Sequence, residues 1–204
     1  HKKKIKARIS SNLNFFPAGY EKDLVRSKLH HLVVSIDGIT QKTYSQYRVG
    51  GSLPKVLESV KKINLEKKKQ KSRFPFVTWQ FIIMNHNENE INKAKKLAKK
   101  WGFDRIVFQR NRGDMGKELF GSRKKQSKTC HFLWNQSVIN WNGSVSPCCL
   151  YYDEKYDFGN ALEEGFFRVW NNQKYQEARR LVIKKQSQDK NLVCWNCIRK
   201  GFPA

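Results

Sequence analysis

Four of the five cysteines in this chain, Cys130, Cys148, Cys194 and Cys197, have a spacing that suits a metal or cluster site. The last two lie in a Cys-Trp-Asn-Cys turn, so one short segment offers two thiolates. The first two bracket a predicted β-hairpin, because Asn142-Gly143 is a preferred tight turn. Four thiolates on two short segments are typical of a tetrahedral Zn²⁺ site or an iron–sulfur cluster.

Other roles for the cysteines are weaker. Cys149 is interpreted as a bystander, since adjacent cysteines seldom bind one centre together. Scattered buried cysteines and disulfides remain alternatives. No apolar run approaches the roughly 20 residues that span a bilayer, and the lysine-rich start has no signal-peptide core. A cytoplasmic location with no membrane partner is therefore predicted, where cysteines more often serve metal or redox chemistry than disulfides.

The positive charge of the chain is uneven. Of the net charge of +24, residues 1–129 carry +21, from 31 Lys and Arg against 10 Asp and Glu. Residues 130–204 carry +3, from 10 against 7. The charge boundary coincides with the first cysteine, which indicates two modules. Such a charge favours nucleic-acid binding in principle, but lysine runs on solvated helix faces are the preferred explanation.

The elements that must position these cysteines alternate between strand and helix at first. Apolar, β-branched segments predict strands at residues 5–13, 31–37, 76–84 and 105–109. Helices are predicted around Lys22–Leu29, after the potential cap Ser52, and through Ile91 to Trp101, ending at Gly102. This alternation predicts a parallel α/β arrangement with right-handed crossovers and sites at the carboxyl ends of the strands.

The remaining residues have a different sequence pattern. Residues 111–129 are basic and aperiodic, which predicts a linker or an ordered surface loop. A hairpin follows over residues 137–146, and then one helix is predicted from about Glu163 to Ile183. The Cys-x-x-Cys turn comes after that helix.

The order of these features resembles that of radical SAM enzymes with a C-terminal SPASM or twitch iron–sulfur domain. The domain's Cys-x(n)-Gly-x4-Cys opening is similar to Cys130, Gly143 and Cys148. Further similar segments are Ser10-Ser11-Asn12, Val34-Ser35-Ile36-Asp37-Gly38, Tyr47-Arg48, Gly50-Gly51, Gln80–Asn87, Phe158–Leu162, Val169–Asn171 and Tyr175. The resemblance implies an α/β chain with the later strands of a partial (β/α) radical SAM barrel at 1–128 and a small α+β SPASM/twitch-like domain at 129–204.

Two departures from the family pattern are plain. The Cys-x3-Cys-x2-Cys motif of the cluster that cleaves S-adenosylmethionine is absent, since no cysteine precedes Cys130. The acidic loop that contacts the methionyl amine is absent as well. The chain starts at His1 and has four candidate strands against the family's six, so a truncated fragment that is inactive alone is predicted.

The resemblance implies a function and a set of site residues. An auxiliary [4Fe–4S] cluster would be bound by Cys130, Cys148, Cys194 and Cys197; the full-length protein would add S-adenosylmethionine and a second [4Fe–4S] cluster. Such oxidoreductase-type enzymes abstract hydrogen from a peptide, protein or small-molecule substrate and take electrons from a donor such as a flavodoxin or ferredoxin. The residues implied for cofactor or substrate binding are Asn12, Ser35 and Asp37, although Asn12 and Asp37 are also ordinary turn formers. Catalytic residues are not indicated.

A competing hypothesis is a non-enzymatic protein with a four-cysteine zinc knuckle that binds nucleic acid through the basic module. A zinc ribbon usually has two close Cys-x-x-Cys hooks, whereas Cys130 and Cys148 are far apart. The basic stretches also lack the interleaved aromatic residues that stack on bases. A degenerate barrel without catalysis is a third possibility.

Overall fold

The computed structural model describes residues 5–110, 130–149, 153–187, 189 and 191–200. The chain divides into two compact units, His1–Asp114 and Met115–Ala204, here called unit 1 and unit 2. The predicted boundary between residues 128 and 129, and the predicted linker at 111–129, lie outside the described residues. The boundary therefore stays a prediction.

Unit 1 contains a four-stranded parallel sheet in the order β1-β2-β3-β4. The strands are β1 (Arg8–Ser11), β2 (His31–Ser35), β3 (Phe76–Ile83) and β4 (Arg105–Arg110). Each strand pairs with the next in sequence, as expected of successive right-handed crossovers. The four predicted strands and their parallel arrangement are thus confirmed.

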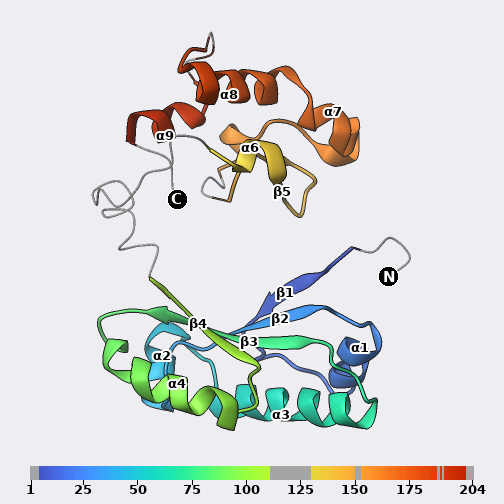
Figure 1. The fold of residues 1–204 in the computed structure, drawn as a ribbon, viewed down its shortest axis with the longest axis vertical. Coiled ribbons are helices and arrows are strands. Elements are labelled where there is room, and N and C mark those ends of the chain that lie inside the picture. The colour runs from blue at the N-terminus through green and yellow to red at the C-terminus, as the bar shows by residue number, and fades with distance from the viewer. Residues whose placement is uncertain (1–4, 111–129, 150–152, 188, 190, 201–204) are drawn as a thin grey trace. The chain divides into compact units, whose positions relative to one another are not determined.

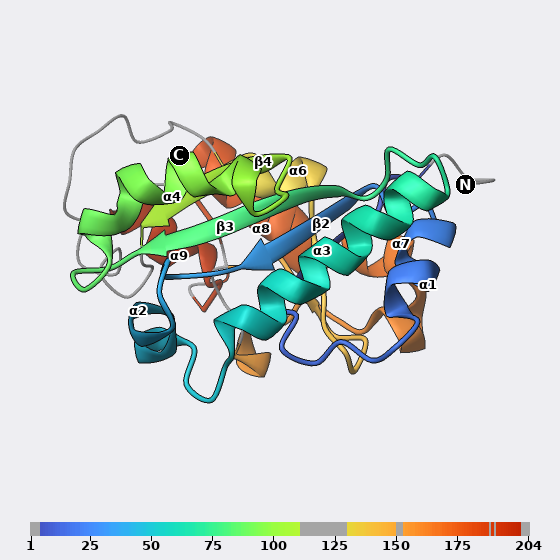
Figure 2. The same cartoon turned by 90° about the horizontal axis from the view of Figure 1, so that it is seen from below.

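Four helices connect the strands and cover one face of this sheet (Figures 1 and 2). They are α1 (Tyr20–Arg26), α2 (Gln41–Tyr47), α3 (Leu53–Lys69) and α4 (Ile91–Lys100), with a short 3₁₀ turn, η1 (Glu88–Glu90), before α4. Ser52 precedes α3 as predicted, but its hydroxyl makes no capping hydrogen bond. The sequence interpretation did not include α2, which Thr40 caps by accepting a hydrogen bond from the Thr43 N–H at 3.1 Å.

The core of unit 1 follows from strand alternation. Leu32, Val34 and Ile36 are buried on the helix-covered face, and the register places Leu32 beside Val77 and Val34 beside Trp79. Val56, Val60 and Ile63 of α3 supply the facing stripe and are fully buried. The Trp79 ring stacks on Trp101 with centroids 4.9 Å apart. This packing fixes the strands and therefore the loops at their carboxyl ends.

Unit 2 is smaller and mostly helical. The predicted hairpin is present as β5 (Val138–Ile139) and β6 (Val145–Ser146). Its helices are α6 (Phe132–Asn135), α7 (Phe166–Trp170), α8 (Gln173–Lys184) and α9 (Cys194–Lys200); two short turns are η2 (Glu154–Tyr156) and η3 (Ala161–Gly165), the latter a π-helix. Across the described parts of both units, no helix has the length and apolar character needed to span a bilayer.

The prediction of one helix from Glu163 to Ile183 was wrong. The helix is interrupted at Asn171 and Asn172, and α8 begins after Asn172. The Asn172 side-chain oxygen accepts a hydrogen bond from the Tyr175 N–H at 3.1 Å, and its Nδ2 donates to the Phe158 carbonyl at 2.7 Å. Asparagine favours such caps over helix interiors, and this one also ties α8 to the segment after the hairpin.

Candidate functional site

The four predicted ligand cysteines lie on three parts of unit 2. Cys130 is half-buried just before α6, and Cys148 is buried just after β6. Cys194 and Cys197 are both buried in α9, which begins at Cys194. None of the five cysteines, all of which lie among the described residues, forms a disulfide, and Cys149 is exposed. The structure thus separates the exposed bystander from the four inward cysteines.

Electrostatics shows that the four thiols are neighbours. Burial raises the pKa of Cys194 far above its ordinary value, and the nearby thiols of Cys197, Cys148 and Cys130 raise it further. Each of these thiols disfavours a second negative charge beside it. A bound multivalent cation or cluster would remove that penalty, so the donor set fits a thiolate-ligated centre.

The cysteines approach one another without forming a finished coordination shell. Among the described residues, no group of three or more His, Cys, Asp or Glu side chains has an arrangement that could hold a metal ion. The fit to a cluster therefore rests on the chemistry and shared neighbourhood of the thiols and not on coordination geometry. Binding would have to draw the sulfur atoms together.

The cysteines border the apolar core of unit 2. Cys194 and Cys197 pack with Leu133, Val145, Phe158, Val169, Tyr175, Ala178, Leu181, Val182, Leu192 and Val193. Tyr175 is fully buried, and its hydroxyl lies 2.8 Å from the Ser137 hydroxyl. Burial raises the pKa of Tyr175 above its ordinary value, which keeps the phenol neutral beside the thiols. A dry, neutral surrounding of this kind influences the potential of a bound redox centre.

Gly143 explains why the hairpin can lie close to the segment before α7. Its φ is +85°, and an added Cβ would lie 2.6 Å from both the Asn160 Oδ1 and the Leu162 Cγ. The glycine thus provides a left-handed turn and a close approach together. Ala161 N donates to the Gly143 carbonyl at 2.8 Å, so the turn is bonded directly to that segment.

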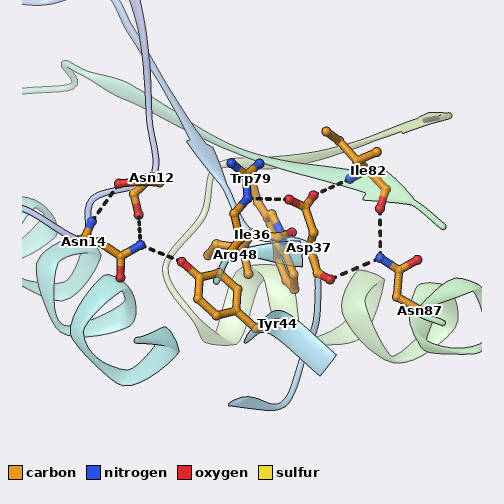
Figure 3. A network of polar contacts seen from close by, with 9 residues as sticks. All are labelled: Asn12, Asn14, Ile36, Asp37, Tyr44, Arg48, Trp79, Ile82 and Asn87. Atoms are coloured by element: carbon orange, nitrogen blue, oxygen red, sulfur yellow. Dashed lines mark hydrogen bonds and ion pairs between the residues drawn. The ribbon is translucent and has the colours of Figure 1, made fainter. Parts of the chain in front are cut away.

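A second polar cluster lies at the carboxyl ends of β2 and β3 in unit 1 (Figure 3). Asp37 is fully buried and accepts hydrogen bonds from the Ile82 N–H at 2.6 Å and from the Arg48 Nε at 2.7 Å. Burial raises the pKa of Asp37, while the Ile82 N–H and Arg48 act in the opposite direction. Both carboxylate oxygens are thus engaged within the protein.

Asn87 extends this network, and its role could not be seen in the sequence. Its Nδ2 donates to the carbonyls of Asp37 and Ile82 at 3.1 and 2.9 Å (Figure 3). Its Oδ1 accepts from the Met84 N–H at 2.7 Å. The sequence predicts a polar loop at residues 85–87, but nothing in it distinguishes Asn87, whose side chain is buried, from Asn85 and His86. The neighbouring His86 has a buried Nε2 that makes no hydrogen bond.

Asn12 and Ser35, the other residues implied for cofactor binding, lie near the same end of the sheet. Asn12 follows β1, and its Oδ1 accepts from the Asn14 N–H at 3.0 Å, which is a local turn (Figure 3). Asn14 donates to the Tyr44 hydroxyl at 2.7 Å and so joins β1 to α2. Ser35 is half-buried at the end of β2, beside Gln80 in the register.

Comparison with known proteins relates most of unit 2 to a known family. The sequence from residue 130 to residue 198 matches the model of the SPASM family, described as an iron-sulfur cluster-binding domain. Residues 130–198 are thus similar to a SPASM domain. The match begins at Cys130 and ends one residue after Cys197, so it contains all four inward cysteines.

One curated protein is similar to part of this chain. The chain is 29% identical over 73 residues to the S-adenosyl-L-methionine-dependent 2-deoxy-scyllo-inosamine dehydrogenase of Niallia circulans, which is 36% of this chain and 29% of that protein. The chain thus covers less than a third of this curated relative.

Two solved structures share the fold. One is anSMEcpe with bound AdoMet, with a TM-score of 0.63 and 18% identity over 88% of this chain and 57% of that chain. The other is SuiB of Streptococcus suis bound to S-adenosylmethionine, with a TM-score of 0.65 and 15% identity over 87% of this chain and 50% of that chain. The chain therefore spans about half the length of these structures. The predicted relationship to radical SAM enzymes with a SPASM domain, and the predicted fold, are confirmed.

Proposed function

We propose that this chain is part of a radical SAM/SPASM enzyme in which Cys130, Cys148, Cys194 and Cys197 bind an auxiliary [4Fe–4S] cluster. The observation that carries the proposal is that Cys194 and Cys197 lie in the apolar core of unit 2 with Cys130 packed against it, while Cys148 is among the nearby thiols that raise the pKa of Cys194. The SPASM match over the same residues supports it. When bound, such a cluster supplies one-electron transfer.

Unit 2 would contribute the environment of that cluster. Two ligands come from one helical turn, because Cys194 and Cys197 are three residues apart in α9 and share a face. The loop after β6 supplies Cys148, and the hairpin ties it to the chain that follows Cys130. Tyr175 and its apolar neighbours exclude water from this side of the site.

Unit 1 would bind part of S-adenosylmethionine or of the substrate at the carboxyl ends of its strands. Asn12 and Ser35 are the proposed hydrogen-bonding side chains. Asp37, whose oxygens are both engaged, is proposed to act by holding Arg48 and the end of β3 in place. The cleavage of S-adenosylmethionine would require a second [4Fe–4S] cluster in the full-length protein.

The substrate is proposed to be a peptide, a protein or a small molecule from which hydrogen is abstracted in an oxidation. A structure of anSMEcpe with bound AdoMet and Cp18Cys peptide has a TM-score of 0.64 to this chain over 98% of it and 66% of that chain. That likeness supports the peptide class. A flavodoxin or ferredoxin is the proposed electron donor, and the cytoplasm the proposed location.

The test is anaerobic reconstitution of the chain with iron and sulfide, followed by a visible spectrum and metal analysis. We expect a brown protein with about four irons. The double variant Cys194→Ala/Cys197→Ala should lose both colour and iron. Cys149→Ala, which removes the exposed neighbouring thiol, should keep both.

Two results would contradict this proposal. Equal loss of iron in Cys149→Ala would remove the distinction between the inward cysteines and the bystander. A colourless protein that retains one tightly bound zinc after reconstitution would overturn the redox function, and the zinc-knuckle hypothesis would replace it.

A further inference from the structure

A basic groove lies at the amino-terminal side of the sheet in unit 1, between α3, α4 and the start of β4. Its volume is about 850 Å³, within the range of ligand-binding clefts. Asn64 of α3 joins the two sides, because its Nδ2 donates to the Gly102 carbonyl at 2.7 Å. The cations that line the groove are Lys67, Lys68, Lys71, Lys95, Lys99 and Arg105.

The charge of this groove is mostly uncompensated. Asp104 is the one acidic residue of its lining, and it is occupied by the Lys67 ammonium at 3.3 Å and by the Val77 N–H at 2.7 Å. In the part of the chain that the structure describes, none of the other five cations has a carboxylate within ion-pair distance. Six cations against one acid create a strongly positive local potential.

An apolar pocket adjoins the basic groove. It has a volume of about 290 Å³ and is lined in part by Leu57, Leu65 and Trp101. It shares Asn64, Lys68 and Gly102 with the groove, so the two form one continuous surface. Leu65 is 56% exposed, which leaves an apolar side chain open to a partner beside the cations.

The helix ends at the groove determine which anion fits. Lys67 to Lys69 lie in the last turn of α3, and Lys99 and Lys100 in the last turn of α4. The C-terminal end of a helix carries partial negative charge, which disfavours a compact phosphate on the floor of the groove. The long lysine side chains instead present separate charges to an extended partner with spaced carboxylates.

We propose that this basic groove and its apolar pocket are the docking site for an acidic peptide segment that carries one large apolar side chain. The carboxylates meet the lysines of α3 and α4, and the apolar side chain enters the pocket beside Leu65 and Trp101. Nucleic acid fits less well, because the aromatic ring lining the groove, Phe103, is only 5% exposed and offers no stacking surface.

Within unit 1, this docking site is separate from the proposed cofactor site. Arg105 is the first residue of β4, whereas Asp37 and Asn87 lie at the carboxyl ends of strands in the same parallel sheet. Peptide binding at the groove therefore does not depend on the proposed redox function and can be tested without iron.

The experiment is fluorescence anisotropy of the whole chain with a labelled, glutamate-rich peptide that has one central leucine. We expect the triple variant Lys68→Glu/Lys71→Glu/Lys99→Glu to bind at least about tenfold more weakly. The control Lys22→Glu/Lys42→Glu/Lys55→Glu has the same net charge, and its three exposed lysines lie outside the groove lining. It should keep most of the affinity, and added salt should weaken binding to the wild type.

One further variant, measured with two peptides, tests the apolar pocket. Leu65→Ala should weaken binding of the leucine peptide about threefold or more, but should not change binding of the same peptide with alanine at its centre. Equal losses in the two triple variants would show a response to overall charge and would overturn the proposal. Tighter, groove-dependent binding of a DNA oligonucleotide or of phosphatidylserine vesicles would overturn the peptide assignment.

Discussion

At the scale of single residues, Asp37 shows why a side chain named from a motif can have a different task in the fold. The motif implied contact with a cofactor, while the structure gives both carboxylate oxygens to Ile82 and Arg48. The sequence indicated the place, since Asp37 follows a buried strand. It could not show the partners, because Arg48 and Ile82 meet Asp37 only through tertiary packing.

Replacement of Asp37 by asparagine should change how stability depends on pH. The pKa of Asp37 in the folded protein is above its ordinary value of 3.8, mainly because of burial. The folded state therefore holds this proton more tightly than the unfolded state. The contribution of Asp37 to the unfolding free energy is complete at pH values below its ordinary pKa, and it is lost as pH rises through its raised pKa in the folded protein. Asp37→Asn should flatten this decline in urea-unfolding free energies measured across the acidic range.

A matched control for this substitution is Asp23→Asn. Asp23 pairs with Arg26 at 2.6 Å, but its side chain is 63% exposed. Exposed pairs contribute little to stability, so the pH profile should stay close to that of the wild type. A wild-type profile that rises over the window where Asp37 ionises, and does so equally in Asp37→Asn, would refute the assigned direction.

Gly143 allows a comparison with Gly19, a positive-φ glycine of unit 1. Gly143→Ala should cost about 2–3 kcal/mol of unfolding free energy, from left-handed strain and from contact with Asn160. Asn160 cannot yield freely, because its Oδ1 accepts from the Leu162 N–H at 2.9 Å. Gly19→Ala also changes a left-handed glycine, with a φ of +93°, and has nothing within 4 Å of the added Cβ, so it should cost only about 1–2 kcal/mol. Urea denaturation measures both, and equal costs would argue against the contact.

At the scale of elements, the sequence predicted those with a strong period and missed those defined by a cap. The four strands and the stripe of α3 follow from runs of apolar residues that one buried face requires. The short helix α2 has only Tyr44 buried, so its sequence has no apolar periodicity that would predict a helix. The break between α7 and α8 depends on Asn172 bonding to Phe158, a contact that local sequence does not reveal.

The packing of β3 against α4 can be tested through Trp79. Its Nε1 donates to the Ile36 carbonyl at 2.7 Å, and its ring is fully buried. Trp79→Phe removes the donor and part of the ring, so we expect a loss of about 2–3 kcal/mol in unfolding free energy. Trp141→Phe alters a side chain that is 96% exposed and should change stability by less than about 0.5 kcal/mol. Similar losses in the two variants would contradict this account of the core.

At the scale of the whole molecule, the two units differ in what should stabilise the fold of each one. The core cluster of unit 1 contains no cysteine among its described residues, whereas the core of unit 2 includes Cys194 and Cys197. The charge step and the first cysteine pointed to two modules, and the structure divides the chain in two. The sequence could not show that the four thiols lie near one another without forming a complete coordination shell, since their separation depends on the position of α9.

Removal of the cluster by a chelator should therefore affect the units unequally. Hydrogen–deuterium exchange of the reconstituted chain should speed up in α8 and around the hairpin after chelation, because binding and folding are coupled there. Exchange in β2 and β3 should remain unchanged. Faster exchange of β3 to the same extent would show that unit 1 also depends on the cluster.

The order of the sheet has a consequence for handling the protein in solution. Within the described residues, β1 and β4 each pair on one side only, and an open strand edge can recruit a second copy and start aggregation. Both edges bear guanidinium groups, Arg8 on β1 and Arg105 and Arg110 on β4. Identical chains that approach edge to edge would bring these cations together, so the sheet's own arginines oppose self-association and favour solubility at low ionic strength.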